Sequence, residues 1–238
     1  MDGYLIPDHV YLCKTREGIL FLNLRTDKYL GVSGKDLEYL AALVPGWPIR
    51  PAHCDTPEMS ERAAQVARKL QHAGLLTTDP AEGKSAHPST LENGASSLLQ
   101  QLPHPLSRSA PFLLVRLAYA ALKVSAVLKF RSLEWVVRRA RQKKKARGNC
   151  DAAAASHAIA TLTSDFIRLR PLVYSAHGKC LYDCLVLLEF LSLSRLFPTL
   201  VIGVTTFPFK AHCWLQDGGV VLTDYTERTR DYTPILVI

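Results

Sequence analysis

The chain has 238 residues, of which 48% are hydrophobic and 21% are charged. This length and composition allow one or two folded domains and exclude a wholly disordered or collagen-like chain. The formal net charge is +8, and nine of the basic residues fall between Lys129 and Arg147, where Glu134 is the only acid. The excess of positive charge is therefore concentrated in one stretch of the chain.

We expect a cytoplasmic protein without an integral membrane span. The first ten residues, MDGYLIPDHV, have neither the basic start nor the apolar run of a secretory signal. The apolar stretch 112–128 is interrupted by Arg116 and Lys123 and is shorter than the ~20 residues of a spanning helix, so it predicts a core or interface helix. The six cysteines show no framework spacing, which favours free thiols in a reducing compartment.

Residues 1–80 have the pattern of a small folded unit. Three β-rich runs, His9–Lys14, Ile19–Leu24 and Lys28–Val32, are separated by turn residues. Ser33 then has the position of an N-cap for a helix over Asp36–Val44. A second helix is predicted between residues 57 and 76, closed by Gly74; its apolar residues at helical spacing are Ala63, Val66, Ala67, Leu70 and Ala73. Three strands and two helices in this order predict a small winged-helix-like domain.

The rest of the chain predicts a linker and an α+β domain. Residues 81–109 are rich in Pro, Ser, Gly and Thr and have weak periodicity, which is typical of a linker. From Ala110 the chain is predicted to be helical to about Arg147, with further helices over Ala152–Arg168 and within 177–197. A β-branched strand, PTLVIGVTTF, and a closing hairpin follow, so residues 110–238 are assigned to one α+β domain.

The closing hairpin can bring a histidine to an aspartate. If a three-residue turn is centred on Gly218, Gln216 faces Val220, Trp214 faces Leu222 and His212 faces Asp224. Directly opposed residues have Cβ atoms ~4.5–5.5 Å apart, so the carboxylate can accept a hydrogen bond from the imidazole. This prediction depends on the register, since a slip of one residue sends the aspartate to the other face.

Cys180 is the best candidate nucleophile for such a pair. It follows Gly178 and Lys179 at the predicted start of a helix, where free N–H groups and the helix dipole favour thiolate over thiol. Cys184 lies one turn further along among apolar residues, and Cys213 alternates away from His212. The backbone N–H of Cys180 is the one oxyanion donor that the sequence identifies.

Structural readings of the same residues remain open. A single histidine in a strand or cysteine at a helix start commonly serves packing, and Asp224 could cap a turn. Cys180, Cys184, His212 and Cys213 are also soft metal ligands. However, neighbouring strand residues point to opposite faces and no second Cys or His pair has finger-like spacing, so we expect no metal and no cofactor.

The C-terminal motifs resemble the B protein of lasso-peptide biosynthesis, the leader peptidase. The matching elements, in order over about 175–238, are Cys180-Leu181, Gly203-Val204, Pro208-Phe209, Ala211-His212-Cys213-Trp214 and Asp224. The resemblance implies a transglutaminase-like, papain-related cysteine protease domain with Cys180 as nucleophile, His212 as base and Asp224 as the orienting acid. It implies removal of a precursor's leader peptide before a separate, asparagine-synthetase-like cyclase closes the ring.

Residues 1–80 are similar to the RiPP recognition element, the leader-binding domain that accompanies this peptidase. The resemblance implies that the leader adds as a strand beside Lys28–Val32 and a helix over Ser60–Ala73. The leader-binding residues that we predict are Lys28, Tyr29, Leu30, Val32, Arg62, Val66 and Lys69.

Two rival functions stay open at this point: a non-catalytic module that delivers the leader, and a transglutaminase-type acyl-transfer enzyme with the same triad. The basic stretch 129–147 is read as a solvated helix end or as a docking surface for an acidic partner. Nucleic-acid binding is not expected, because the predicted second helix of the N-terminal domain is only modestly basic.

Overall fold

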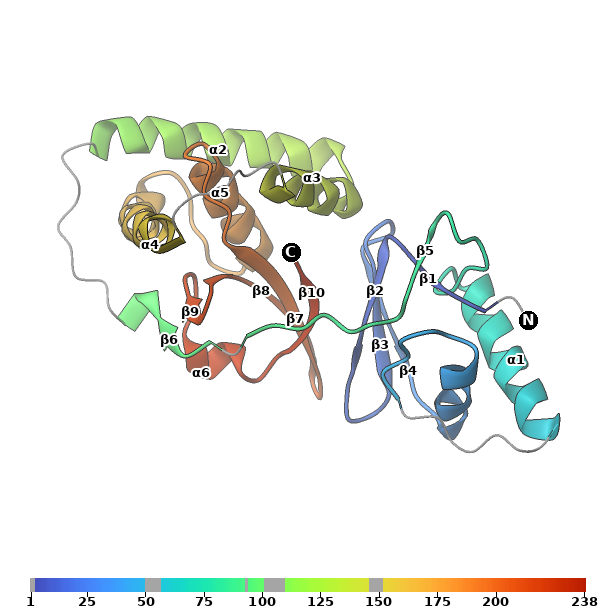
Figure 1. The fold of residues 1–238 in the computed structure, drawn as a ribbon. Helices are drawn as coiled ribbons and strands as arrows, with labels where there is room; N and C mark the ends of the chain where they lie inside the picture. The colour runs from blue at the N-terminus through green and yellow to red at the C-terminus, as the bar shows by residue number, and fades with distance from the viewer. Residues whose placement is uncertain (1–2, 50–56, 93, 101–109, 146–151) are drawn as a thin grey trace. The chain divides into compact units, whose positions relative to one another are not determined.

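The structure is a computed structural model that describes residues 3–49, 57–92, 94–100, 110–145 and 152–238 (Figure 1). The chain divides into two compact units. One comprises Met1–Thr90 with Thr206–Pro208 and Thr233–Leu236, and the other comprises the remaining residues from Leu91 onward. We call them the N-terminal and C-terminal units and describe each by itself.

An antiparallel three-stranded sheet forms the centre of the N-terminal unit. Its strands are β2 (Val10–Lys14), β3 (Ile19–Asn23) and β4 (Lys28–Val32), in the order β2-β3-β4. The three strand predictions are therefore confirmed. A separate pair joins β1 (Ile6–Pro7) to β5 (Gly83–Lys84), so the segment predicted as a linker begins with a strand of this unit.

Two helical segments complete the N-terminal unit. The first is a 3-10 helix, η1 (Lys35–Ala42), capped by Gly34 at φ 133° without a side-chain bond, so the predicted N-cap role of Ser33 is wrong. The second is α1 (Pro57–His72), which Gly74 ends as expected, at φ 70°. Apolar residues of the strands and both helices share one core, including Phe21, Leu40, Ala67 and Leu70. The winged-helix likeness stays a prediction.

Four long helices form most of the C-terminal unit: α2 (Ala110–Phe130), α3 (Leu133–Lys145), α4 (Ala152–Leu169) and α5 (Cys180–Ser192). The helical stretch expected from Ala110 is interrupted at Arg131 and Ser132. The hydroxyl of Ser132 accepts a hydrogen bond from the Trp135 N–H at 3.3 Å and so begins α3. Short helices η2 (Leu98–Gln100), η3 (Arg170–Leu172) and α6 (Thr226–Thr229) lie in the connections.

A five-stranded sheet has the order β10-β7-β8-β9-β6, and all of its strands except most of β10 and the last residue of β7 belong to the C-terminal unit. Its strands are β6 (Ser96–Ser97), β7 (Thr199–Thr206), β8 (Phe209–Asp217), β9 (Val220–Val221) and β10 (Thr233–Val237). The edge strand β6 pairs in parallel with β9, so part of the predicted linker belongs to this sheet. The other edge strand, β10, was not predicted either.

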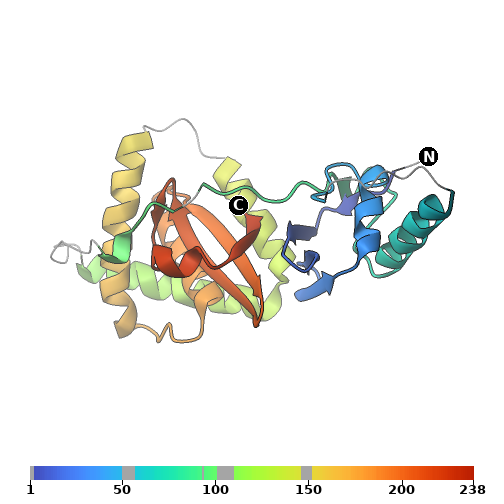
Figure 2. The same cartoon turned by 90° about the horizontal axis from the view of Figure 1, so that it is seen from below.

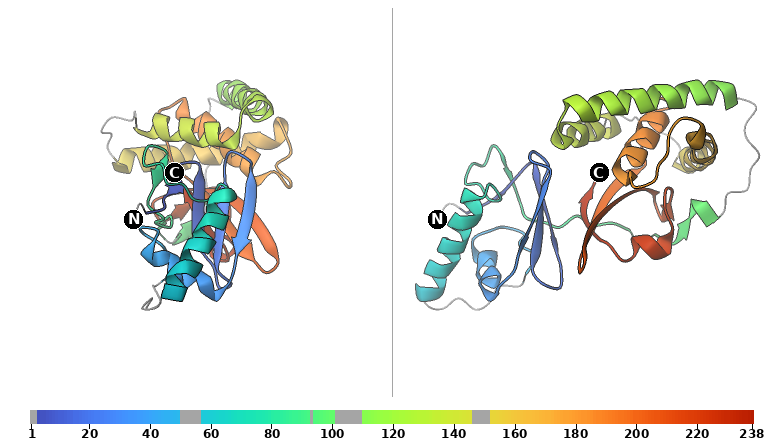
Figure 3. Two further views of the ribbon diagram at one scale, coloured as in Figure 1. Left: turned by 90° about the vertical axis from the view of Figure 1, so that its right-hand side faces the viewer. Right: turned by 180° about the vertical axis from the view of Figure 1, so that it is seen from behind.

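Helix α5 lies between the sheet and α2 in Figures 1 and 3, and Figure 2 shows the strands in front of α2. Its buried residues include Leu187, Phe190 and Leu191, which is why its sequence is apolar on nearly every side. Trp214 packs on the sheet with Val201 and Val221. Gly203 makes room for it, since a Cβ there would stand 2.7 Å from the indole. The contacts with α5 and the packing of Trp214 together fix the position of β8.

Helix α2 has an unusual distribution of side chains. Arg116 donates from Nε to the carbonyl of Phe190 at 2.9 Å, and Lys123 pairs with Glu189 at 2.6 Å, so both charges bind α5. Large apolar side chains are exposed instead: Phe112, Val115, Tyr119, Leu122 and Phe130. The helix is long and apolar enough to cross a membrane by length and composition, although this test is also passed by core helices.

Candidate active site

Cys180 is the first residue of α5, as predicted, and Lys179 is the N-cap. The first helical hydrogen bond of α5 is donated by the backbone N–H of Asp183 to the Lys179 carbonyl at 2.9 Å. The N–H groups before it lack partners within the helix, and they carry the positive end of the helix dipole. The sulfur therefore lies where a negative charge is stabilised.

The hairpin differs from its predicted register by one residue. Gln216 pairs with Val221 and Asp217 with Val220, which makes a two-residue Gly218-Gly219 turn. Continued unchanged, this register would move Asp224 out of line with His212. The ladder ends early instead, because the hydroxyl of Thr223 accepts the Leu215 N–H at 3.0 Å and the chain bends.

Because of this bend, His212 and Asp224 still meet. Nε2 of His212 lies 2.5 Å from Oδ2 of Asp224, and their side chains are only 15% and 7% exposed. The other carboxylate oxygen accepts the Tyr225 N–H at 2.8 Å. The contact that the sequence predicted is present, but it forms at a bend after the strand and not by cross-strand pairing.

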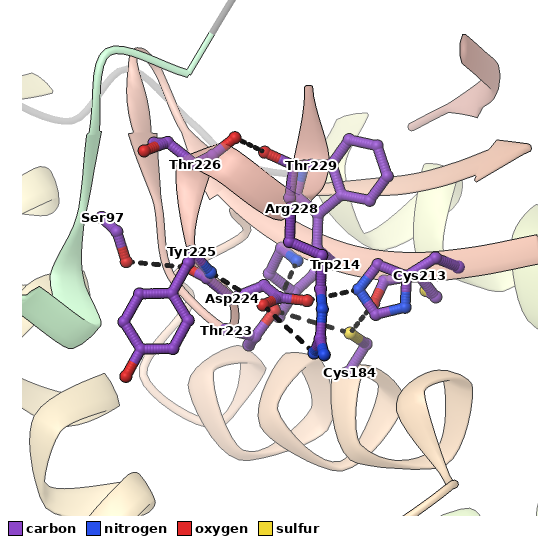
Figure 4. A network of polar contacts seen from close by, with 12 residues as sticks. Ser97, Cys184, Cys213, Trp214, Thr223, Asp224, Tyr225, Thr226, Arg228 and Thr229 are labelled. Atoms are coloured by element: carbon purple, nitrogen blue, oxygen red, sulfur yellow. Dashed lines mark hydrogen bonds and ion pairs between the residues drawn. The ribbon is translucent and has the colours of Figure 1, made fainter. Parts of the chain in front are cut away.

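Ser97 holds the backbone of Asp224. Its hydroxyl is fully buried and donates to the Asp224 carbonyl at 2.7 Å, as the network in Figure 4 shows. Arg228 approaches the same carboxylate at 3.7 Å from the following helix. Sequence reasoning missed both partners, because Ser97 lies in the segment taken for a linker.

Cys180 and His212 line the same cavity, and the interaction with His212 is the largest cause that lowers the pKa of the Cys180 thiol. Burial opposes the effect, while the backbone N–H groups of Cys213 and Leu181 add to it. Because Nε2 of the histidine faces Asp224, the ring nitrogen left for the sulfur is Nδ1. The three side chains therefore lie at one site, where all of them line the same cavity.

The pKa of His212 shifts in the opposite direction. Burial lowers it, but the hydrogen bond to Asp224 and the interaction with Cys180 outweigh burial and raise the pKa to about 9. For Asp224, burial raises the pKa, and the bonds from His212 and the Tyr225 N–H reverse this and keep it below its usual value. Lower thiol and higher imidazole pKa values together favour a thiolate–imidazolium pair near neutral pH.

Two aromatic rings fix the imidazole. The ring of His212 is stacked on Trp214 at a centroid distance of 6.1 Å and lies 5.2 Å from Tyr232. Trp214 is 1% exposed and donates through Nε1 to Gln216 at 3.3 Å. The stacking limits rotation of the histidine, which keeps its two nitrogens directed at the sulfur and the carboxylate.

The second turn of α5 holds a different thiol. Cys184 is buried, and its Sγ donates to the Cys213 carbonyl at 3.3 Å and lies 3.8 Å from the Thr223 hydroxyl. Cys213 is buried beside it. Two causes raise the pKa of the Cys213 thiol well above its ordinary value: the larger is its contact with Cys184, and the second is its burial. Cys213 is thus kept neutral.

A polar cavity of about 580 Å³ opens beside Cys180 and is lined also by His212, Asp183 and Arg170. Asp183 is buried one turn after Cys180, and it binds Arg170 at 2.6 Å and the Tyr174 hydroxyl at 2.8 Å. This network anchors the first turn of α5 to the segment that precedes it. The sequence contains one signal for this network, an aspartate one turn after Cys180 on the same helix. Its partners Arg170 and Tyr174 could not be predicted from the sequence.

The predicted leader-binding residues all belong to the N-terminal unit. Strand β4, with Lys28, Tyr29 and Leu30, is at the edge of its sheet, and Leu30 is 45% exposed. Val32 and Val66 both pack partly against the core of this unit. Arg62 and Lys69 are exposed on α1. These positions are compatible with strand addition, which stays a prediction.

The soft ligands weighed for a metal, Cys180, Cys184, His212 and Cys213, all line the cavity beside Cys180. Among the described residues, no three His, Cys, Asp or Glu side chains are arranged to hold a metal ion.

Residues 120–237 match the family model described as the transglutaminase-like superfamily. The C-terminal part of the chain therefore contains a transglutaminase-like domain, of a class that usually works as a cysteine-dependent enzyme. This confirms the mixed helix and sheet content and the transglutaminase-like part of the predicted fold. Comparison with curated proteins and with solved structures found no match.

Proposed function

We propose that this protein is a cysteine peptidase that binds a lasso-peptide precursor through its leader and removes the leader before a separate cyclase acts. The observation that supports the chemistry best is the contact between His212 and Asp224 at a cavity that Cys180, the first residue of α5, also lines. The transglutaminase-like domain is compatible with this chemistry.

In the proposed reaction, the Cys180 thiolate attacks the carbonyl carbon of the last leader residue. The C–N bond breaks as the imidazolium of His212 gives its proton to the leaving amine, which becomes the new N-terminus of the core peptide. Water then attacks the acyl-enzyme, His212 takes its proton, and the leader leaves with a free carboxylate. Asp224 holds the ring orientation throughout.

The N-terminal unit has the proposed role of leader recognition. The exposed edge of β4 offers backbone groups for an added strand, and such addition gives affinity through backbone hydrogen bonds. The asparagine-synthetase-like cyclase is the proposed recipient of the product.

Mass spectrometry on a single turnover distinguishes this proposal from its rivals. A peptidase converts the precursor into a leader fragment and a core fragment whose masses sum to that of the precursor plus one water. A transglutaminase-type enzyme gives an adduct with an added amine, and a delivery module leaves the mass unchanged. Either of these last two results would contradict the proposal.

Leu30→Asp is expected to separate binding from chemistry. A charge on the exposed edge of β4 opposes seating of the leader, so precursor affinity should fall roughly tenfold, as for the loss of one buried apolar contact. Cleavage of a short peptide without the leader should keep its rate, because the change is outside the cluster at Cys180. Tyr39→Phe, also in the N-terminal unit, is a matched control. Unchanged precursor affinity would remove β4 from recognition.

A further inference from the structure

A second cavity lies in the C-terminal unit, between α2, α3 and the second half of α5. It has a volume of about 210 Å³ and a mostly apolar lining that includes Val124, Val127, Trp135, Val136 and Leu188. It shares no lining residue with the cavity beside Cys180. The proposed peptidase chemistry gives it no role.

The rim of this cavity is strongly basic. Four cations line it: Lys123 from α2, and Arg139, Lys143 and Lys144 from α3. Glu189 of α5 is the one acidic residue among its lining residues, and it binds Lys123 at 2.6 Å and Lys143 at 2.8 Å. Among the lining side chains, cations therefore outnumber acids by four to one.

Arg139 is the rim cation that is most available to a ligand. The other three cations are already bound. Lys123 and Lys143 pair with Glu189, and Lys143 also donates to the Ser192 hydroxyl at 3.2 Å. Lys144 donates to the Thr199 hydroxyl at 3.1 Å. Within the part of the chain that the structure describes, Arg139 has no acidic partner. Its guanidinium can therefore pair with an anionic ligand without breaking an existing ion pair among the described residues.

The size and charge of the cavity define its ligand. A dry apolar cavity of ~150 Å³ accommodates a benzene ring, so this one has room for a phenyl or indole group. Two of the four lining cations, Arg139 and Lys144, do not pair with Glu189, so a ligand with more than one anionic group matches the cavity best. A fatty acid carries a single carboxylate and leaves one of these two cations unmatched, whereas a peptide with several acids beside an aromatic residue can pair with both.

We propose that this cavity, defined as the α2–α3 pocket, binds an acidic peptide segment through one aromatic anchor residue. The aromatic side chain enters the apolar interior beside Trp135, and flanking Asp or Glu side chains pair with Arg139 and Lys144. The site gives the basic end of α3 a binding role separate from the cluster at Cys180.

The test uses full-length protein and a fluorescein-labelled peptide, Asp-Glu-Asp-Trp-Asp-Glu-Asp, with binding followed by fluorescence anisotropy. Replacing the peptide's tryptophan with alanine should weaken binding at least ~10-fold, since an aromatic group then stays out of the apolar interior. Binding should also weaken as salt rises, because the flanking pairs are exposed.

Matched variants on α3 locate the site. Arg139→Glu should weaken the peptide at least ~10-fold by reversing a rim charge, and Ala140→Trp should abolish binding by filling the cavity. Arg138→Glu makes the same charge change on an exposed neighbour outside the lining and should change affinity less than ~3-fold. Circular dichroism identifies a misfolded variant, in which case Arg139→Gln replaces Arg139→Glu.

Three results would overturn the proposal. Equal losses for Arg138→Glu and Arg139→Glu would indicate non-specific attraction to the basic helix. Equal binding of the alanine peptide would show that the cavity is not used. Displacement of the peptide by octanoate at a similar concentration would make the ligand a small amphiphile. A Cys180→Ala protein should bind the peptide normally, so failure here is distinct from failure of the peptidase proposal.

Discussion

The first and second turns of α5 place two thiols one turn apart in opposite surroundings. Cys180 lies at the helix N-terminus beside an imidazole that is braced by a carboxylate, and its pKa is lowered. Cys184 is 1% exposed and its sulfur contacts a backbone carbonyl and a hydroxyl. The same residue type on the same helix is thus prepared for reaction at one position and for packing at the next, which shows that position on the helix decides the chemistry.

The largest expected effect comes from exchanging these thiols for alanine one at a time. Cys180→Ala should reduce precursor cleavage by roughly 10⁴-fold or more, because the nucleophile is lost. Cys184→Ala should leave the rate within a few-fold and cost about 1 kcal/mol of stability through a small cavity. Cleavage assays and thermal melts measure both.

Thiol labelling sharpens the same contrast. Iodoacetamide at neutral pH should modify Cys180 in the native protein, and peptide mapping should find Cys184 and Cys213 modified only after unfolding. If Cys184→Ala abolished cleavage while Cys180→Ala retained it, the nucleophile would be Cys184 and the assignment of Cys180 would be wrong.

Asp224→Asn is expected to have the next largest effect. In the active form the thiol is deprotonated and the imidazole protonated, so kcat/KM should rise through the lowered pKa of Cys180 and fall above the His212 pKa of about 9. Removing the carboxylate removes a bond that raises the pKa of His212, so the alkaline limb should move toward neutral pH. The maximal rate should fall roughly 10²–10⁴-fold. An unmoved alkaline limb in the pH profile would exclude the assigned role of Asp224.

Ser97→Ala is expected to give the smallest effect of the series. It leaves the buried carbonyl of Asp224 without its hydroxyl donor, at a cost of about 1–3 kcal/mol. The melting temperature should fall by several degrees and the cleavage rate by up to ~10-fold, through a less fixed carboxylate. Ser96→Ala, on the same strand, is the control; a loss as large as that of Ser97→Ala would contradict the specific contact.

Local sequence signals predicted much of this molecule. Turn residues gave the three N-terminal strands, and a Gly-Lys pair before an apolar run gave the start of α5. The register of the final hairpin could not be obtained in this way, because Asp217-Gly218-Gly219 accommodates a two-residue or a three-residue turn. The Thr223 hydroxyl, which ends the ladder, depends on side-chain geometry that no spacing rule contains.

The missed parts of the fold and of the site depend on distant contacts. Strands β6 and β10 are short, and each exists only through pairing with a partner far along the chain. The Arg170–Asp183 pair depends on how η3 meets α5. Such contacts carry no periodicity, so a reading of local patterns assigns their residues to linkers and loops.

The parallel pairing of β6 with β9 has a consequence for a chain that is still being made. The sulfur-bearing helix is synthesised before the histidine strand, and the aspartate comes later still, held by a serine that left the ribosome 127 positions earlier. A nascent chain therefore has a cysteine without an oriented base until β9 docks against β6. Under the proposed function, we expect the chain to become reactive only after residue 224 has been added and has met His212.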